Sequence, residues 1–329
     1  EFRKLPFDGA PTDEEGMIDL HRPYVDDVTM ACPVCGKTAR RVPDVADVWF
    51  DSGSMPYAQA HYPFEEKRQK GRKKNAPHNF PADFISEGID QTRGWFYTLM
   101  AVSVMLGNRS PYKNVVSLGL VLDKYGQKMS KSKGNVVDPW YVIQKFGVDA
   151  VRWYFYTVNS PADSKNFDEE EIGKTFRRFL MVAYNSFVFL QLYGKDKLKL
   201  DEIPSSKHPL DAWIVMRLLA LTQEMQKKMD GYDVVAATSL IETFLDDLSR
   251  WYIRRSRRRL QKPDSKEDWI AASATLAYVL LQFSKIIAPF TPFFAESLYQ
   301  SLKRSYSFSA KDSVHMELMP HLSLKIDKA

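Results

Sequence analysis

The hydrophobic and polar positions of this chain follow different periods in its two halves. Up to about residue 160, short apolar runs alternate with stretches of helical period, which is the pattern of an α/β fold. Beyond about residue 168, apolar positions recur at helical spacing and no run resembles a strand. We therefore expect an irregular segment with at most short strands over residues 1–45, an α/β region over 46–160 and an all-α helical bundle over 161–329.

Turn residues and helix caps mark the expected elements within these regions. In the α/β part we expect strands over residues 80–85 and 115–122, and helices over 90–106, 139–146 and 149–158. The bundle helices are expected over residues 169–193, 209–229, 234–260, 265–288 and 293–305.

The most informative stretch joins an apolar run to a lysine-rich loop. Residues 115–122 are almost continuously apolar, as in a parallel strand that is covered on both faces and ends at a ligand crevice. The loop that follows reads KMSKSKGN over residues 128–135, and its ammonium and hydroxyl groups suit a polyphosphate. A solvated basic turn is the alternative. A Walker loop is excluded, because neither Gly119 nor Gly126 has a glycine five positions on.

A second group of polar residues surrounds a predicted turn between a strand and a helix. Glu87, Asp90 and Gln91 lie at the start of the helix, where one carboxylate normally suffices as a cap. Two carboxylates and an amide around Gly88 exceed that need, and they suit an ammonium group and sugar hydroxyls. Trp95 follows one helical turn after Gln91, on the same face.

Trp49 lies in an aromatic and acidic stretch, DVWFDSGS, over residues 47–54. A buried core position is the ordinary explanation for a tryptophan. A turn of small residues beside an indole is also a common wall of small-ligand pockets, so Trp49 is a candidate binding residue.

Two cysteines form the knuckle Cys32-Pro33-Val34-Cys35, which is followed by a glycine. Such a knuckle supplies two of the four ligands of a tetrahedral zinc site. A redox motif would open a helix after a strand, whereas turn residues surround this one. We expect a structural zinc half-site at Cys32 and Cys35, with two inert thiols as the alternative. So few cysteines also favour a reducing compartment, and hence a cytoplasmic protein.

The net charge of +5 is modest for 329 residues, so contact with nucleic acid would require a local basic patch. The predicted helix 234–260 carries one, because seven basic residues and no acid lie between residues 248 and 263. Arg254, Arg257 and Arg258 share the face opposite an apolar stripe and are candidate contacts to RNA phosphates. A solvated arginine face is the alternative. Arg255 and Arg259 extend the stripe and are expected to pair inside the protein.

The composition is that of an ordinary globular protein, with 44% hydrophobic and 13% aromatic residues. No apolar run reaches membrane-spanning length, so we expect no membrane contact. The chain begins at Glu1 without an initiator methionine or a signal segment, and we expect it to be a fragment of a longer, monomeric protein.

Three strings occur together: DVWFDSGS at residues 47–54, EGIDQTRGWF at 87–96 and KMSKS at 128–132. This combination resembles the isoleucyl-tRNA synthetases, which are class I aminoacyl-tRNA synthetases. SRWYIRRSRRR at residues 249–259 is similar to a helix of that family's anticodon-binding domain. The resemblance implies the second half of a Rossmann-like catalytic domain, followed by the anticodon-binding bundle.

The reaction implied by the resemblance is activation of L-isoleucine by ATP with Mg²⁺, followed by transfer of the acyl group to tRNA(Ile). The implied ATP loop is Lys128, Met129, Ser130, Lys131 and Ser132, in which the two lysines neutralise the departing pyrophosphate. The implied binding residues of isoleucine and its adenylate are Trp49, Glu87, Gly88, Asp90, Gln91 and Trp95. The tryptophans would wall the side chain, and the polar residues would hold the amino group and the ribose.

The sequence also departs from the family. The His-x-Gly-His signature and the editing domain are absent, and the six histidines occur in no such arrangement. We therefore expect the chain alone to be inactive. The alternatives are a non-catalytic tRNA-binding fragment, a nucleotide-binding module, or another class I synthetase of the valine, leucine and methionine group.

Overall fold

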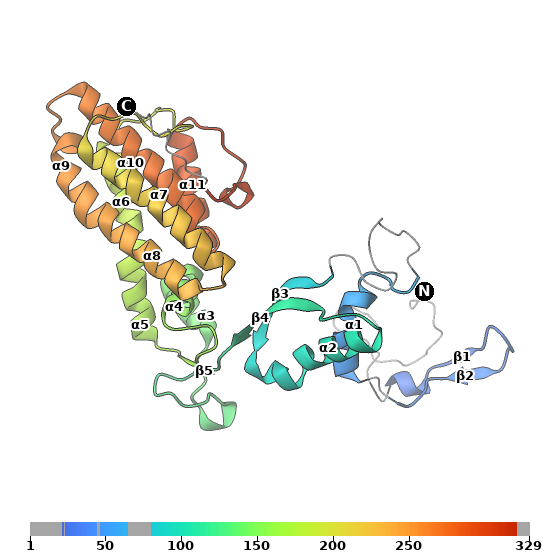
Figure 1. Ribbon diagram of the computed structural model, residues 1–329. Coiled ribbons are helices and arrows are strands. Elements are labelled where there is room, and N and C mark those ends of the chain that lie inside the picture. Colours follow the sequence, from blue (N-terminus) through green and yellow to red (C-terminus); the bar gives the residue numbers. More distant parts are fainter. Residues whose placement is uncertain (1–21, 23, 45–46, 65–79, 321–329) are drawn as a thin grey trace. The chain divides into compact units, whose positions relative to one another are not determined.

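The structure is a computed structural model that describes residue 22 and residues 24–44, 47–64 and 80–320. Contacts divide the chain into two compact units (Figure 1). The first is made of residues 1–82 and 91–113, and the second of residues 83–90 and 114–329.

The first unit contains a β-hairpin and a pair of helices. Strands β1 (Thr29–Ala31) and β2 (Thr38–Arg40) pair antiparallel, after the 3₁₀ helix η2 (Tyr24–Asp27). Helix α1 (Val48–Ala58) packs against α2 (Trp95–Met105). The contact is close, since a Cβ at Gly53 would lie 2.8 Å from the backbone of Thr98.

Two small sheets open the second unit. Strand β3 (Ala82–Gly88) pairs with β4 (Tyr112–Leu118), and β5 (Val121–Leu122) pairs parallel with β6 (Lys165–Asn166). The 3₁₀ helix η3 (Ile89–Arg93) follows β3, and η4 (Lys131–Lys133) lies in the lysine loop.

The prediction of one strand over residues 115–122, covered on both faces, is wrong. The strand is interrupted at Gly119, whose N–H donates to Pro161 O at 2.9 Å. A Cβ at Gly119 would lie 2.2 Å from Asp163 O, so the chain passes directly against the loop that precedes β6. Val115 and Val121 are 43% and 41% exposed, because each sheet has only two strands in the described part of the chain.

Helices build the rest of the second unit and confirm the predicted bundle. Two π-helical turns keep long helices continuous: η5 (Phe176–Leu180) joins α5 to α6, and η6 (Asp247–Ile253) joins α8 to α9. The helices are α3 (Pro139–Phe146), α4 (Val148–Thr157), α5 (Glu169–Thr175), α6 (Met181–Tyr193), α7 (Pro209–Asp230), α8 (Val234–Asp246), α9 (Arg254–Gln261), α10 (Lys266–Ile287) and α11 (Pro292–Ser305), with a 3₁₀ turn η7 (Val314–Met316) after them.

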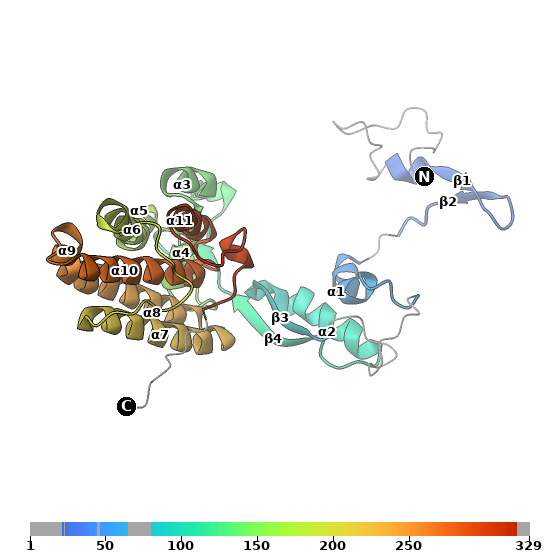
Figure 2. The same ribbon diagram turned by 90° about the horizontal axis from the view of Figure 1, so that it is seen from above.

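Helices α7, α8 and α10 lie side by side in both views (Figures 1 and 2). Their apolar faces form the main core, which α4 joins through Trp153, whose ring stacks on that of Phe179 with centroids 3.7 Å apart. Helix α10 is long and apolar enough to cross a membrane by length and composition, contrary to the prediction from the sequence. It is nevertheless a core helix, because 78% of its most apolar window is buried inside the protein.

Candidate functional site

Two tryptophans and a glutamine come together in the first unit. The backbone N–H of Trp95 donates to Gln91 Oε1 at 2.9 Å, so this side chain caps helix α2. The indole N–H of Trp95 donates to Ser52 O at 3.1 Å. A Cβ at Gly94 would lie 3.0 Å from the indole of Trp49, so glycine is what allows that ring to approach.

Trp49 is 44% exposed, which contradicts the alternative of a buried core residue. Its position at the start of α1 is fixed by Asp47, whose carboxylate accepts from the N–H groups of Trp49 and Phe50. Trp95 is half-buried. The two indoles therefore present partly open apolar surface held on rigid helix ends, which is a suitable wall for an aliphatic side chain.

Glu87, Gly88 and Asp90 lie together at the end of β3 in the second unit. Both carboxylates are exposed, and neither forms an ion pair with any residue that the structure describes. A Cβ at Gly88 would lie 2.6 Å from Asp90 Oδ1, so a side chain there would displace the carboxylate. Two exposed carboxylates three residues apart, beside this glycine, are suited to a cationic group.

The lysine loop follows β5 in the same unit. Leu122 and Lys128 form an antiparallel bridge across a turn in which Gly126 has φ of +78°. Lys128 is exposed, and Ser130 Oγ lies 3.2 Å from Ser132 Oγ. Met129 is half-buried. The backbone of Lys131 lies in η4, but its side chain is outside the described part of the structure.

Arginines cover one face of α9 and the π turn before it. Arg254 and Arg257 are exposed and make no ion pair with any other described residue. Arg250 pairs with Asp246 at 3.3 Å and Arg258 with Asp264 at 3.0 Å. These acids lie just outside the acid-free interval 248–263, and both pairs are solvent-exposed and therefore weak.

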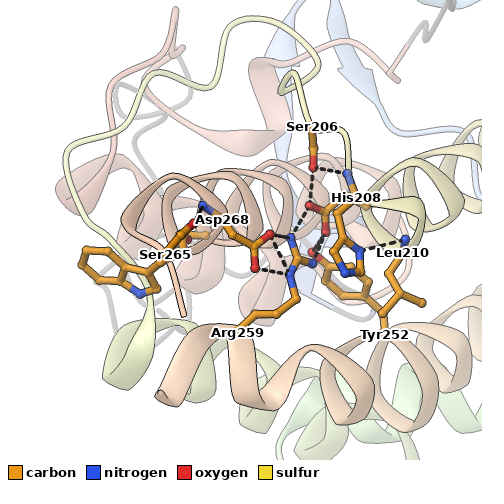
Figure 3. Close-up of polar contacts among 10 residues, drawn as sticks. Ser206, His208, Leu210, Tyr252, Arg259, Ser265 and Asp268 are labelled. Atoms are coloured by element: carbon orange, nitrogen blue, oxygen red, sulfur yellow. Dashed lines mark hydrogen bonds and ion pairs between the residues drawn. The ribbon is translucent and has the colours of Figure 1, made fainter. Parts of the chain in front are cut away.

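Arg259 is buried and holds three helices together. Its guanidinium donates to both carboxylate oxygens of Asp211 on α7 at 2.8 Å, and to Asp268 on α10. Figure 3 shows Arg259 between Asp268 and Tyr252. The hydroxyl of Tyr252 donates to Asp211 Oδ1 at 2.7 Å, and that of Ser206 donates to Oδ2 at 2.6 Å. The predicted internal pairing of Arg259 is confirmed.

Burial alone would raise the pKa of Asp211. Hydrogen bonds from Arg259, Ser206 and Tyr252 outweigh burial and hold that pKa below its ordinary value. Hydrogen bonding by Arg259 likewise lowers the pKa of Asp268. Both carboxylates are therefore charged at neutral pH, and the guanidinium is fixed between them.

An exposed aromatic group beside the arginines was not anticipated. Tyr252 is buried, but Trp251 is 44% exposed. The guanidinium of Arg255, which was expected to pair inside the protein, lies 3.7 Å from the centroid of the Trp251 ring. The Trp213 ring lies 6.3 Å from the same indole. Trp251 and Arg255 are four residues apart on one helix, and this spacing could have predicted their contact from the sequence.

Cys32 and Cys35 lie at the turn of the β1–β2 hairpin and are free thiols. Hydrogen bonds from the backbone N–H groups of Cys35 and Val34 lower the pKa of Cys32, which favours the thiolate that binds metal. Among the residues that the structure describes, no three His, Cys, Asp or Glu side chains cluster as a metal site. The knuckle therefore has suitable chemistry but only two of the four ligands that zinc requires.

A cavity of about 720 Å³ lies in the second unit, against β3, β4, α4 and the turn between α7 and α8. Its walls are mainly apolar and include Phe84 and Tyr232. Its buried amine, Lys165, already donates to Asn159 Oδ1 and Ser160 O, each at 2.7 Å. None of the predicted site residues lines this cavity.

Comparison with known families gives two matches along the chain. The family of class I tRNA synthetases for I, L, M and V matches residues 11–168. The anticodon-binding domain of tRNA ligases matches residues 211–328.

The chain is similar to curated isoleucine–tRNA ligases. It is 46% identical over 302 residues to that of Clostridium acetobutylicum, covering 91% of this chain and 29% of that protein. It is 45% identical over 307 residues to that of Thermus thermophilus, covering 92% of this chain and 29% of that protein. The chain thus spans about 30% of the length of these relatives.

Solved structures show the same fold. A ternary complex of Agrobacterium radiobacter LeuRS with tRNA and LeuAMS has a TM-score of 0.64 at 22% identity, covering 89% of this chain and 35% of that chain. Mycobacterium tuberculosis methionyl-tRNA synthetase with methionyl-adenylate has a TM-score of 0.62 at 22% identity, covering 79% of this chain and 51% of that one.

Proposed function

Because the chain belongs to the class I tRNA synthetases of the I, L, M and V group, we propose that it is part of an isoleucine–tRNA ligase. The observation that carries the proposal is 44–46% identity to such ligases over 91–92% of the chain. The complete protein would join L-isoleucine to ATP, release pyrophosphate and transfer the acyl group to tRNA(Ile). It would act in the cytoplasm as a monomer.

The roles of the catalytic residues follow from their chemistry. Trp49 and Trp95 provide apolar surface for an aliphatic side chain such as that of isoleucine. Glu87 and Asp90 offer carboxylates that form no ion pair with a described residue, and these suit an ammonium group and the hydroxyls of a ribose. Gly88 permits the close approach. The lysines of residues 128–132 stabilise the charge that develops on pyrophosphate, and Mg²⁺ would accompany ATP as part of the substrate.

The arginine face and the exposed indole together suit an anticodon arm. Arg254 and Arg257 make no ion pair among the described residues and are available to phosphates, with Arg258 beside them. Trp251, already stacked with Arg255, offers a flat surface to an unpaired base. Single-stranded RNA is commonly bound by this combination of guanidinium groups, which contact phosphates, and aromatic rings, on which bases stack.

The knuckle of Cys32 and Cys35 would supply two ligands of a structural zinc site, with the remaining ligands elsewhere in the complete protein. It has no part in the chemical steps proposed here.

The direct test is aminoacylation by the purified complete protein. We expect it to charge tRNA(Ile) with labelled isoleucine in the presence of ATP. Failure to charge this tRNA, with charging of a leucine, valine or methionine tRNA instead, would assign the chain to another enzyme of the group. Tight tRNA binding with no charging at all would favour the second candidate, a tRNA-binding protein without catalysis. This candidate is retained because the chain covers only 29% of the length of the relative from Clostridium acetobutylicum.

A further inference from the structure

Two side chains tie the ends of the lysine loop together. Asp123 follows β5 at the start of the loop, and Asn135 lies at its end. The amide nitrogen of Asn135 donates to Asp123 Oδ2 at 2.9 Å. This contact joins residues 12 positions apart and closes the loop into a ring that contains all of residues 128–132.

Both side chains also bind the backbone inside the ring. Asp123 Oδ1 accepts from the N–H groups of Tyr125 at 3.0 Å and Gln127 at 2.8 Å. Asn135 Oδ1 accepts from the N–H of Ser130 at 2.9 Å, and its amide nitrogen also donates to Lys128 O at 3.3 Å. Every hydrogen-bonding atom of the two side chains is therefore engaged with the loop or with the other side chain.

The placement of this pair is unusual for a surface loop. Asp123 is only 8% exposed, whereas the loop around it is largely solvent-exposed. The fixed backbone positions, at Lys128 and Ser130, lie on both sides of Met129 and immediately before Lys131. Three lysines that repel one another would otherwise favour many loop shapes, and a polyphosphate would have to order them on binding.

We propose that Asp123 and Asn135 are positioning residues that hold the lysine loop in the shape that receives the triphosphate of ATP. The proposal rests on the proposed function, since it concerns the same reaction. Neither side chain is required to touch ATP. Their effect is to fix the backbone from which Lys128 and Lys131 extend, so that less conformational freedom is lost when the nucleotide binds.

The test exchanges the two groups in the complete protein. Asn135→Asp places one carboxylate against another. In Asp123→Asn, the side-chain oxygen is needed by the N–H groups of Tyr125 and Gln127, so the new amide nitrogen faces the amide nitrogen of Asn135. Each single variant therefore weakens the contact. The double variant, Asp123→Asn with Asn135→Asp, restores one donor and one acceptor. Asp312→Asn is the matched control. The substitution removes the same charge as Asp123→Asn, but the Asp312 side chain is 99% exposed.

Pyrophosphate exchange is measured with ATP and isoleucine varied separately. Each single variant should lower kcat/KM for ATP roughly 10-fold or more, by loss of hydrogen bonds to a charged group, while the KM for isoleucine and the affinity for tRNA(Ile) stay unchanged. The double variant should recover most of the loss, as coupled neighbours do. Asp312→Asn should behave like the parent.

Two results would overturn the proposal. The first is that the single variants keep the parental kcat/KM for ATP while Lys128→Ala impairs pyrophosphate exchange. That result would contradict the positioning role but leave the proposed function standing. The other is an equal loss of ATP, isoleucine and tRNA binding without recovery in the double variant, which indicates a general loss of folding. If Lys128→Ala and Lys131→Ala also leave exchange unchanged, the proposed role of the loop fails as well.

Discussion

Lys131 is the residue on which the proposed chemistry depends most. Because its ammonium group would stabilise charge on the departing pyrophosphate, we expect Lys131→Ala to lower the rate of adenylate formation roughly 100-fold or more in the complete protein. Isoleucine binding should be nearly unchanged. Pyrophosphate exchange measures the rate, and equilibrium dialysis measures isoleucine affinity.

The matched control is Lys124→Ala. Lys124 lies in the same loop but outside the 128–132 segment, and its ammonium group rests 4.9 Å from the centroid of the Tyr125 ring. It should retain parental exchange. A parental rate in the Lys131 variant would mean that the loop is only a solvated basic turn.

Cys32 and Cys35 lead to a prediction about metal. Since the described residues supply only two zinc ligands, this 329-residue chain should bind zinc weakly or not at all. Metal analysis after treatment with a mild chelator tests this, with Cys32→Ser as the control for any residual binding. Stoichiometric zinc that resists the chelator would show that further ligands exist in the chain or that two chains share a site.

Residue positions on the basic helix were largely predictable, and Arg255 is the exception. The apolar stripe of this helix consists of Ile241, Phe244, Leu245, Leu248 and Tyr252, and all five are buried as expected. Beyond the π turn over residues 247–253, Ser256 and Arg259 continue this buried face at helical spacing. Arg255, between Tyr252 and Ser256 in the sequence, is exposed beside Trp251.

At the scale of elements, Arg259 is the main polar link between α7, α9 and α10. Replacing it with leucine would leave Asp211 buried without its partner. We expect Arg259→Leu to lower the free energy of unfolding by about 3 kcal/mol at neutral pH. Urea unfolding measures the change. Arg258→Leu, on the exposed face of the same helix, should change it by less than about 0.5 kcal/mol.

The effect of Arg259→Leu should depend on pH. The folded protein holds the pKa values of Asp211 and Asp268 below their ordinary range, so their contribution is fully present above about pH 4 and is lost as the pH falls through the folded pKa values. In the variant, Asp211 keeps the hydrogen bonds from Ser206 and Tyr252 but loses those from Arg259, so its pKa is higher than in the parent. The difference between parent and variant should therefore shrink as the pH is lowered from about 4 through the folded pKa values. A difference that is constant with pH would contradict the pairing.

The basic helix leads to a prediction about RNA. Replacing Arg254 and Arg257 together by alanine should weaken tRNA(Ile) binding by the complete protein, because two phosphate contacts are lost. The slope of log affinity against log salt should fall by about 2. Filter binding over a range of salt concentrations measures both quantities, and circular dichroism should show unchanged helicity.

Arg304→Ala is the control for this experiment, since Arg304 is an exposed arginine on the last turn of α11. It should leave affinity and salt slope close to the parental values. If the double variant also keeps them, the arginines form a solvated face and tRNA is held elsewhere.

Strands were less predictable than helices because their neighbours are distant in sequence. The bundle helices carry their own amphipathic period, and all five were predicted. The break at Gly119 depends on Pro161 and Asp163, more than 40 residues later. The glycine within the apolar run was the local signal, but it does not identify these partners. The role of Gln91 was also predicted differently. It was expected to bind the substrate, whereas its amide oxygen accepts the hydrogen bond from the backbone N–H of Trp95 at the start of α2.

At the scale of the whole molecule, the two halves differ in how far their apolar side chains are buried. The bundle buries large side chains such as Trp153, Tyr252 and Phe283 in a continuous core. The α/β part has only two-stranded sheets among the described residues and exposes apolar positions of β4 and β5. The chain also spans about 30% of the length of its relatives. The α/β part could therefore be recognised by its motifs, but the pairing of its strands could not be predicted from its hydrophobic periodicity alone.

The most direct test of the account is the choice of amino acid in pyrophosphate exchange by the complete protein. Isoleucine, valine, leucine and methionine are compared at equal concentrations with ATP. We predict the highest kcat/KM for isoleucine, with valine lower by roughly 10–200-fold because it lacks one methylene group. Exchange that is fastest with leucine, valine or methionine, or exchange with none of the four, would contradict the assignment of this chain to an isoleucine–tRNA ligase.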